Sequence, residues 1–246
     1  MVKVKWLGHA AFKITTDEGK VIYLDPWLER NPVSPVKVKD VDKADIVCVS
    51  HGHNDHIGDA IQIVKKTGAK LICSPEIGHY ADSKGIKYDE DSCPLNVGGS
   101  AKIGNVTVHM TPASHTTELY GEEWINERRC LPGAGSVGYV IQTEKNVRIY
   151  FAGDTGLSVE MKMIGEVYNP HIALLPVGGK YNMGPKLASI AARWIRPEVF
   201  VPMHYNTYPA IRQDMKVLES YLKESVVGVK LFVLNPGDEF EYGEKQ

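Results

Sequence analysis

The sequence predicts an α/β protein in which two β-sheets pack face to face and helices cover their outer sides. Short apolar runs rich in Val and Ile alternate with amphipathic helical patterns in both halves of the 246-residue chain. No linker rich in Pro, Ser or Gly separates the halves, and no internal repeat is visible. Because a sheet must bury one face against another layer, we expect one layered domain over residues 1–246.

The first half contains four predicted strands and one predicted helix. The helix covers residues 57–68, because Ile57, Ile61 and Val64 share one face and Gly68 follows that face. The strands are the short apolar runs at residues 21–25, 45–50, 69–74 and 106–111.

The second half repeats this style and adds two predicted helices. A hairpin is expected over residues 136–144 and 146–154, and further strands at 172–179, 198–204 and 230–234. The helices follow from two apolar stripes, which consist of Leu187, Ile190, Ala191, Trp194 and Ile195, and of Ile211, Met215, Leu218 and Leu222. The longest stretch without clear periodicity is 114–135, and a loop of this length is usually functional or disordered.

Composition and charge exclude several classes of protein. With 28 Lys plus Arg against 30 Asp plus Glu, the net charge is −2, and 43% of the residues are hydrophobic. This balance excludes a disordered chain and argues against a nucleic-acid partner, which would favour a basic excess. No apolar run approaches the roughly 18–20 residues that cross a bilayer, and the N-terminal region lacks the apolar core of a signal peptide. We therefore expect a cytoplasmic protein with no membrane partner.

The cysteines support the same compartment. Cys48, Cys73, Cys93 and Cys130 form no CxxC pair and no short framework. Cys48 and Cys73 lie in apolar runs, where a reduced thiol packs as a small hydrophobe. Reduced, structural cysteines fit an intracellular location.

Candidate metal ligands concentrate in one short run. Three of the nine histidines lie in HGHNDH at 51–56, directly after a predicted strand and directly before a predicted helix. Ligand sites of α/β proteins commonly lie at the carboxyl ends of strands. Imidazole and carboxylate groups suit zinc, manganese and iron, whereas clustered imidazoles with nothing bound would repel one another when protonated. The run therefore predicts a metal site.

Four ligands this close together cannot all bind one small ion. We expect His51 and His53 to turn toward one metal, and Asp55 and His56 toward a second. Each metal then needs further ligands, and three candidates follow predicted strands: His115, Asp154 and His204. The two histidines of this trio, taken singly, would more often be ordinary surface or core residues. Their candidacy depends on their position at strand ends and on the total number of ligands.

These segments, in this order, resemble the metallo-β-lactamase superfamily in its dinuclear form. The resemblance rests on HGHNDH, then His115, then FAGDTG at 151–156 and PMH at 202–204, and it covers nearly the whole chain. More narrowly, WLGHAAF, LDPW, LLPVGG, NMGP and VPMHYNT resemble a subgroup of metal-dependent hydrolases similar to L-ascorbate 6-phosphate lactonase. The resemblance implies an αββα sandwich of two mixed sheets, with the metals at one edge between the sheets.

The resemblance also implies a role for each candidate ligand. The ligands of the first metal are matched by His51, His53 and His115. Those of the second metal are matched by Asp55, His56 and His204, and the carboxylate that bridges both metals by Asp154. Two divalent ions are therefore expected, with zinc as the first choice and manganese or iron as alternatives.

The implied reaction is hydrolysis. Two ions about 3.5–4 Å apart share a water and lower its pKa toward neutrality, and the resulting metal-bridging hydroxide attacks the substrate. Asp55 is expected to orient this hydroxide. The subgroup carries a histidine like His9 beside the metals, which implies a catalytic or supporting role, whereas the alternative is that His9 only packs after a first strand. Asp25 is expected to orient a ligand histidine, and Asp59 is a weaker candidate.

The expected substrate is a small, anionic ester, lactone or phosphoester. Residues 114–135 follow a candidate ligand directly and are expected to overhang the metals. Arg128 and Arg129 in this segment either bind an anionic group or are solvated charges. Other residues that connectivity places near the site are Glu118, Tyr120, Trp124, Lys180, Tyr181, Asn182, Tyr205 and Asn206.

Three other functions stay open at this point. A di-iron oxidoreductase of the same fold normally needs a flavin partner or domain, and the ligand set here is rich in histidine rather than acid. A nucleic-acid phosphodiesterase usually carries a basic surface or an appended domain. A non-catalytic metal-binding protein is the third, and the complete ligand set argues against it. The expected partner is a small-molecule substrate, and an oligomer stays open.

Overall fold

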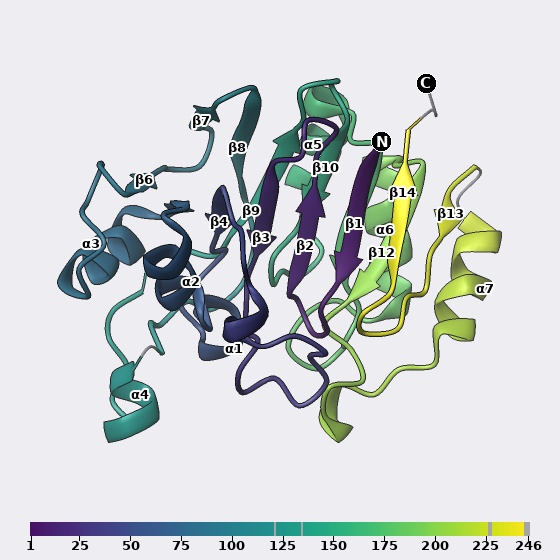
Figure 1. The fold of residues 1–246 in the computed structure, drawn as a ribbon. Helices are drawn as coiled ribbons and strands as arrows, with labels where there is room; N and C mark the ends of the chain where they lie inside the picture. The colour runs from purple at the N-terminus through teal and green to yellow at the C-terminus, as the bar shows by residue number, and fades with distance from the viewer. Residues whose placement is uncertain (121, 134, 226–227, 244–246) are drawn as a thin grey trace.

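The computed structural model describes residues 1–120, 122–133, 135–225 and 228–243, which contain two seven-stranded β-sheets (Figure 1). The sheets share a buried apolar core, in which Phe12 of the first sheet meets Phe151 of the second with ring centroids 6.4 Å apart. Both sheets are mixed, and helices pack on their outer faces. The predicted α/β class, with two facing sheets and helices outside, is confirmed.

The first sheet has the strand order β14-β1-β2-β3-β4-β5-β6. Pairing is antiparallel from β14 to β3 and parallel from β3 to β6. The strands are β1 (Val2–Trp6), β2 (Phe12–Thr15), β3 (Val21–Leu24), β4 (Ile46–Cys48), β5 (Lys70–Cys73), β6 (Ser92–Pro94) and β14 (Glu239–Tyr242).

The second sheet repeats this plan in the order β13-β12-β11-β10-β9-β8-β7. Pairing is antiparallel from β7 to β10 and parallel from β10 to β13, and the predicted hairpin is the β9–β10 pair. The strands are β7 (Ser100–Ile103), β8 (Val106–Pro112), β9 (Val137–Gln142), β10 (Arg148–Phe151), β11 (Ile172–Pro176), β12 (Val199–Met203) and β13 (Lys230–Leu231).

Helices bury one face each against the outer sides of the sheets. Ile63 of α2 and Ile77 of α3 pack with Val47 and Leu71 of the first sheet. On the other side, helices α5, α6 and α7 contribute buried residues to the core shared with the second sheet. The helices are α1 (Asn54–Ile57), α2 (Ala60–Thr67), α3 (Pro75–Ser83), α4 (Glu122–Glu127), α5 (Glu160–Tyr168), α6 (Pro185–Ile195) and α7 (Met215–Ser225), with 3-10 turns at Val38–Asp40 and Pro209–Ile211. In the described ranges, no helix is both long and apolar enough to cross a membrane.

The predicted helix over residues 57–68 is wrong at its start. Helix α1 already begins at Asn54, inside the HGHNDH run, and α2 begins only at Ala60. Gly58 separates the two, because its φ is +42° and a Cβ there would lie 2.6 Å from the Cα of Trp27. Glycine is the residue that tolerates both this conformation and this close approach.

The predicted stripe of α6 is correct in part. Ala191 and Ile195 are buried as expected, but Ala188 occupies the buried face where Leu187 was predicted, and Leu187 is 42% exposed. Short strands such as β2, β6, β7 and β14 and the helix α3 have no counterpart among the predicted elements. Strands β7 and β14 are exposed or half-buried along their length, which weakens the apolar signal on which prediction depends.

Strand direction brings the functional loops together. Strands β1, β3 and β4 run parallel to one another in the first sheet, as do β8, β10 and β12 in the second. The loops that follow these strands meet at one edge of the sandwich, the lower edge in Figure 1. The backbone N–H of Val137 on β9 donates to the carbonyl of Ser50 after β4, which joins the two sheets at this edge.

Candidate metal centre

All seven candidate ligands converge at this edge. The loop after β4 and helix α1 supply His51, His53, Asp55 and His56. The loops after β8, β10 and β12 supply one residue each, which are His115, Asp154 and His204. His9, from the loop after β1, lies among them. Far-apart segments of the chain therefore form one site.

The first group of candidate ligands consists of His51, His53 and His115. One nitrogen from each ring lies within 4.8 Å of the others. The ring centroids of His51 and His53 are 4.5 Å apart, and each lies 5.2 Å from that of His115, with the planes steeply inclined. Rings that point their nitrogens at one volume in this way can share a cation.

The second group consists of His9, Asp55, His56 and His204, whose candidate atoms also lie within 4.8 Å of one another. The Nε2 of His9 is 3.1 Å from the Oδ2 of Asp55. The ring of His9 lies 3.8 Å, centroid to centroid, from that of His204. This group mixes imidazole with carboxylate, whereas the first group is imidazole alone.

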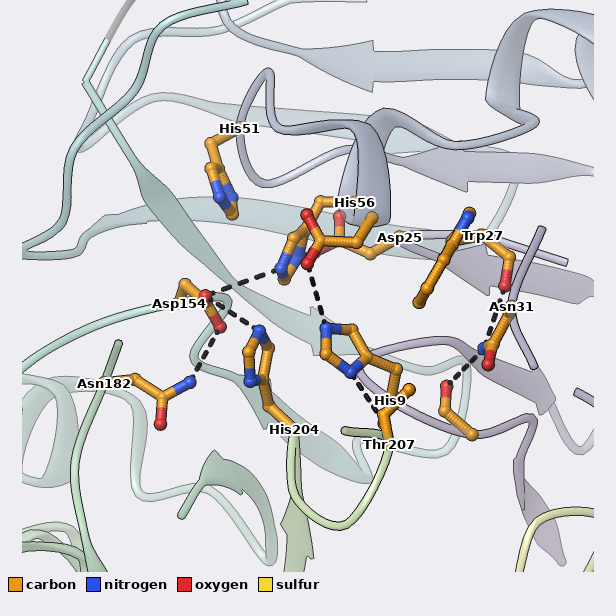
Figure 2. Close-up of polar contacts among 12 residues, drawn as sticks. His9, Asp25, Trp27, Asn31, His51, His56, Asp154, Asn182, His204 and Thr207 are labelled. Carbon is orange, nitrogen blue, oxygen red and sulfur yellow. Dashed lines mark hydrogen bonds and ion pairs between the residues drawn. The ribbon is translucent and has the colours of Figure 1, made fainter. Parts of the chain in front are cut away.

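Asp154 lies between the two groups. Its Oδ2 is 3.0 Å from the Nε2 of His204, 3.5 Å from that of His56 and 3.6 Å from that of His115 (Figure 2 draws the first two contacts). The side chain thus touches both groups through one oxygen. The amide of Asn182 donates to its other oxygen, Oδ1, at 3.3 Å.

Asp25, fully buried after β3, orients two of the histidines. The Nδ1 of His56 lies 2.6 Å from its Oδ2, and the hydroxyl of Ser50 donates to the same carboxylate at 2.5 Å. The Ser50 hydroxyl also lies 2.9 Å from the Nδ1 of His51. Both rings therefore present Nε2 to the site, which is the arrangement in which a carboxylate fixes a histidine ligand.

Burial and charge set the protonation states of these groups. Burial lowers the pKa of His9 and of His53 to about 4, in each case with help from a neighbouring histidine. Burial alone would lower the pKa of His56, but the carboxylates of Asp154 and Asp25 outweigh it and raise that pKa well above its ordinary value. The same attraction, from His204 and His56, holds the pKa of Asp154 well below its ordinary value despite burial.

Three of the site residues have left-handed backbone conformations. The φ angles are +58° at His9, +41° at Asp25 and +55° at His204. Such a conformation costs on the order of 1–3 kcal/mol at a residue other than glycine, and it is concentrated at functional sites. The backbone carbonyl of His9 accepts hydrogen bonds from the N–H of His204 and the indole of Trp6, both at 2.9 Å, which hold the two strained loops together.

The segment 114–135 lies over the first group, as predicted. The ring of Tyr120 stacks on that of His53 with centroids 4.9 Å apart, and its backbone N–H donates to the carbonyl of Gly52. A Leu119–Leu131 bridge closes the segment on itself, and Leu119 is buried against the first sheet's outer core. Residues 121 and 134 and the side chain of Trp124 lie outside the described part of the chain.

The structure also places the weaker candidates in the surroundings of the site. Asp59 does not orient a histidine, because its carboxylate accepts the backbone N–H groups of Leu28 and Glu29. Tyr205 stacks on Trp6 in the core rather than facing the ligands. Arg128 and Arg129 are exposed, and the Nε of Arg129 lies 3.3 Å from the carboxylate of Glu127. Residues at the surface of the described structure also include Glu118, Lys180, Tyr181 and Asn206.

Sequence reasoning missed three residues that contact the site. Ser50 bonds Asp25 and His51, and Thr207 places its hydroxyl 2.8 Å from the Nδ1 of His9. Trp27 packs edge-on against His9 at 5.2 Å. Trp27 lies in the segment LDPW and Thr207 in VPMHYNT. Both segments contribute to the family resemblance, but the resemblance implies no role for either residue.

Comparison with known proteins identifies the family. The family model described as a beta-lactamase superfamily domain matches residues 3–204. A UPF0173 metal-dependent hydrolase from Methanosphaera stadtmanae is 39% identical over 241 residues, covering 97% of this chain and 99% of that protein. A protein with the same name from Staphylothermus marinus is 44% identical and covers 98% of this chain and 100% of that protein.

A solved structure agrees with these relatives. Igni18, described as a novel metallo hydrolase from the archaeon Ignicoccus hospitalis, is 38% identical with a TM-score of 0.83, covering 98% of this chain and 99% of that one. An isothiocyanate hydrolase from Delia radicum gut bacteria has a TM-score of 0.72 at 18% identity, a likeness of fold alone. The chain therefore belongs to the metallo-β-lactamase superfamily and, within it, to the UPF0173 family of metal-dependent hydrolases.

Proposed function

We propose that this protein is a dinuclear metallohydrolase that cleaves a small, anionic ester, lactone or phosphoester. The observation that carries the proposal is the position of Asp154, whose single oxygen Oδ2 contacts histidines of both ligand groups. Two groups of three or more ligands with one carboxylate between them fit two ions rather than one. The resemblance of WLGHAAF and VPMHYNT to lactonase-like hydrolases is the reason that lactones are included.

The residues fit such a metal pair in their hydrogen bonding as well. The Nε2 atoms of His51 and His56 and the Nδ1 of His204 are buried without a hydrogen-bond partner among the described residues. A buried polar atom without a partner is costly, on the order of 1–3 kcal/mol, unless something binds it. Burial lowers the pKa of His51 and His53, and nearby histidines lower the pKa of Asp154, so these three residues favour the neutral imidazoles and ionised carboxylate that bind metal.

The proposed ligand assignment follows the two groups. His51, His53 and His115 would hold one ion, Asp55, His56 and His204 would hold the other, and Asp154, which contacts histidines of both groups, would serve both. The histidine-rich set favours zinc, with manganese or iron as alternatives. When bound, the ions supply Lewis acidity, which lowers the pKa of a water and polarises the carbonyl or phosphoryl oxygen of the substrate.

The protein's own groups handle the proton. Asp55 accepts a hydrogen bond from the attacking water, and its Oδ2 is paired with the Nε2 of His9. The water oxygen forms a bond to the carbonyl carbon or phosphorus while the bond to the leaving oxygen breaks. The His9–Asp55 pair takes up the proton that the water loses and returns it to the leaving oxygen, so protons balance over the reaction. Thr207 holds the opposite nitrogen of His9 and so fixes the direction of the ring.

The test combines metal analysis with a substrate screen. Protein purified without added metal should contain two equivalents of zinc or manganese and should hydrolyse members of a panel of lactones, carboxylic esters and phosphodiesters. The variant His204→Ala should lose metal and activity together. His79→Gln is the matched control, because His79 is an exposed histidine that stacks on Tyr88 outside the site. One equivalent of metal, or two irons with oxidase activity and no hydrolysis, would contradict the proposal.

A further inference from the structure

A cavity of about 460 Å³ adjoins the candidate metal centre. It is bounded by the loop after β3, by helices α1, α2 and α3, and by the segment 114–135. Pockets that bind small molecules typically measure about 300–1,000 Å³. The space is therefore sufficient for the part of a substrate that does not react.

Three residues border both this cavity and the metal centre. Trp27 lines it and also packs against His9, while Tyr120 lines it and also stacks on His53. Asn54 lines it as well and stands between two candidate ligands in the sequence. The cavity therefore lies beside the candidate metal centre, separated from its ligands by single side chains.

The cavity has an apolar wall. Ile57 and Ile61 line it from the helix side, and the buried ring of Tyr80 lines it from α3. Trp27, which is 5% exposed, is held in place by the close approach of Gly58. Rigid apolar and aromatic walls of this kind favour a ring or a short hydrocarbon segment.

Three basic and two acidic residues line the cavity. Arg30 and Lys65 line it, and neither forms an ion pair with any residue that the structure describes. The two acids accept hydrogen bonds from backbone groups, Glu29 from the N–H of Val38 and Asp59 from those of Leu28 and Glu29. A third cation, that of Lys84, is 2.8 Å from the Glu123 carboxylate.

We propose that this cavity binds the non-reacting part of the substrate, and that this part is an apolar ring or short chain ending in a carboxylate or phosphate. Arg30 and Lys65 bind the terminal anion, and Trp27, Ile61 and Tyr80 enclose the apolar segment. The inference rests on the proposed function, because the site is read as the hydrolase's substrate pocket. It assigns the substrate's negative charge to these two cations rather than to Arg128 and Arg129.

The test measures binding rather than turnover. The probes are 3-phenylpropanoate, 2-phenylethyl phosphate and the neutral 3-phenylpropanamide, titrated calorimetrically into the full-length, metal-loaded protein. Both anions or one of them should bind about tenfold more tightly than the amide, the gain expected of charge-assisted hydrogen bonds. The anion with the larger gain identifies the terminal group as carboxylate or phosphate. Equal affinity for all three probes, or no binding of any, would overturn the inference.

Substitutions of residues that line the cavity test whether the probes bind there. Arg30→Gln combined with Lys65→Gln should remove about tenfold of anion affinity and leave amide affinity within twofold. Ile61→Trp, which fills the cavity, should weaken the binding of all three probes. An unchanged melting temperature of this variant would show that it folds. Lys216→Gln is the control, because Lys216 is an exposed lysine on α7. Full anion affinity in the double glutamine variant would overturn the inference.

Failure of this inference is distinguishable from failure of the proposed function. If no ester or lactone is hydrolysed but the probes bind through Arg30 and Lys65, the reaction is wrong and the pocket assignment stands. If hydrolysis occurs but the double glutamine variant keeps its KM for anionic substrates, the pocket assignment is wrong and the reaction stands.

Discussion

The two groups of candidate ligands differ in how firmly the protein holds them. In the second group, His56 lies between the carboxylates of Asp25 and Asp154, and His204 lies 3.0 Å from Asp154. In the first group, His51 is the one member whose ring has a hydrogen bond to another described residue, the Ser50 hydroxyl. Buried carboxylates therefore contact the second group directly, whereas they reach the first only through Ser50 and through the 3.6 Å approach of Asp154 to His115.

The difference also concerns the origin of the supporting residues. The carboxylates that hold the second group belong to Asp25, which follows β3, and Asp154, which follows β10. These two strands are buried and lie in the centres of the two sheets. The first group is covered by Tyr120, from a segment that packs on the sandwich rather than within it. We infer that the second half of the site is formed before metal binds and that the first half is completed by metal and by this segment.

Metal removal should produce the largest effect, because each group of ligands loses the ion that it is proposed to hold. Activity should fall below detection after chelation, and the melting temperature should drop by about 5–10 °C for each bound ion that is removed. Binding at 100 times Kd contributes about 2.7 kcal/mol, and each 1 kcal/mol shifts the melting temperature of a chain this size by about 2–4 °C. Differential scanning calorimetry with parallel metal analysis tests this. An unchanged melting curve in metal-free protein would show that the buried ligands need no ion.

Asp154→Asn should be the most damaging single substitution, because it removes the carboxylate whose single oxygen contacts histidines of both groups. We expect loss of at least one metal equivalent and a roughly 10³-fold lower kcat/KM, the scale seen when an electrostatic stabiliser is removed. Asn182→Ala is the control, since Asn182 contacts the other oxygen of Asp154, and it should cost only a few-fold. Two retained equivalents in the Asp154 variant would mean that the groups are held independently.

His9→Ala should separate catalysis from metal binding. His9 contacts Asp55 and Thr207 and packs against the tilted ring of His204, so it belongs to the firmly held half without being among the seven ligands. We expect full metal content and a kcat lower by about 10²-fold or more, as for other general acid–base groups. Thr207→Val should cost less, about tenfold. Full metal with near-normal turnover would limit His9 to packing, and loss of metal would make it a ligand.

Features of the site that depend on neighbouring residues in the sequence could be predicted, whereas features that depend on contacts between distant loops could not. The HGHNDH run predicts that His51, His53 and His56 lie close together, because its six adjacent residues directly follow a strand. Asp25 could be anticipated because it ends a strand. The roles of Ser50, Trp27 and Thr207 could not, because each depends on contacts between loops far apart in the chain.

The fold shows the same limit. The buried strands β4, β10, β11 and β12 are near-continuous apolar runs and are predicted well. The break at Gly58 and the left-handed backbone at His9 and His204 depend on neighbours that the local sequence does not contain. Local periodicity identifies elements, but the conformations that aim the ligands are set by tertiary contacts.

Asp25→Asn should weaken the second group more than the first, because Asp25 contacts His56 directly and His51 only through Ser50. The neutral amide can no longer attract the His56 imidazole, and it is no longer a charged acceptor for the Ser50 hydroxyl. We expect the affinity for one metal equivalent to fall about 10–100-fold, which is the usual cost of losing a carboxylate that orients a ligand histidine. Competitive titration with a chromophoric chelator measures this. Asp59→Asn is the control, because Asp59 is a buried aspartate that bonds only backbone groups near the site. Equal weakening by both variants would indicate a general loss of stability instead.

Tyr120→Leu should have the smallest effect and bears directly on the first group. The substitution removes the ring that stacks on His53 but leaves the backbone bond from residue 120 to Gly52 intact. An aromatic pair contributes about 0.5–1.5 kcal/mol, so KM should rise a few-fold while both metal equivalents stay bound. Tyr88→Leu, at a tyrosine that stacks on His79 away from the site, is the matched control and should leave KM unchanged. If Tyr120→Leu instead releases metal more readily than Asp25→Asn, the covering segment holds the centre more strongly than the buried carboxylates do, and the comparison between the two groups is reversed.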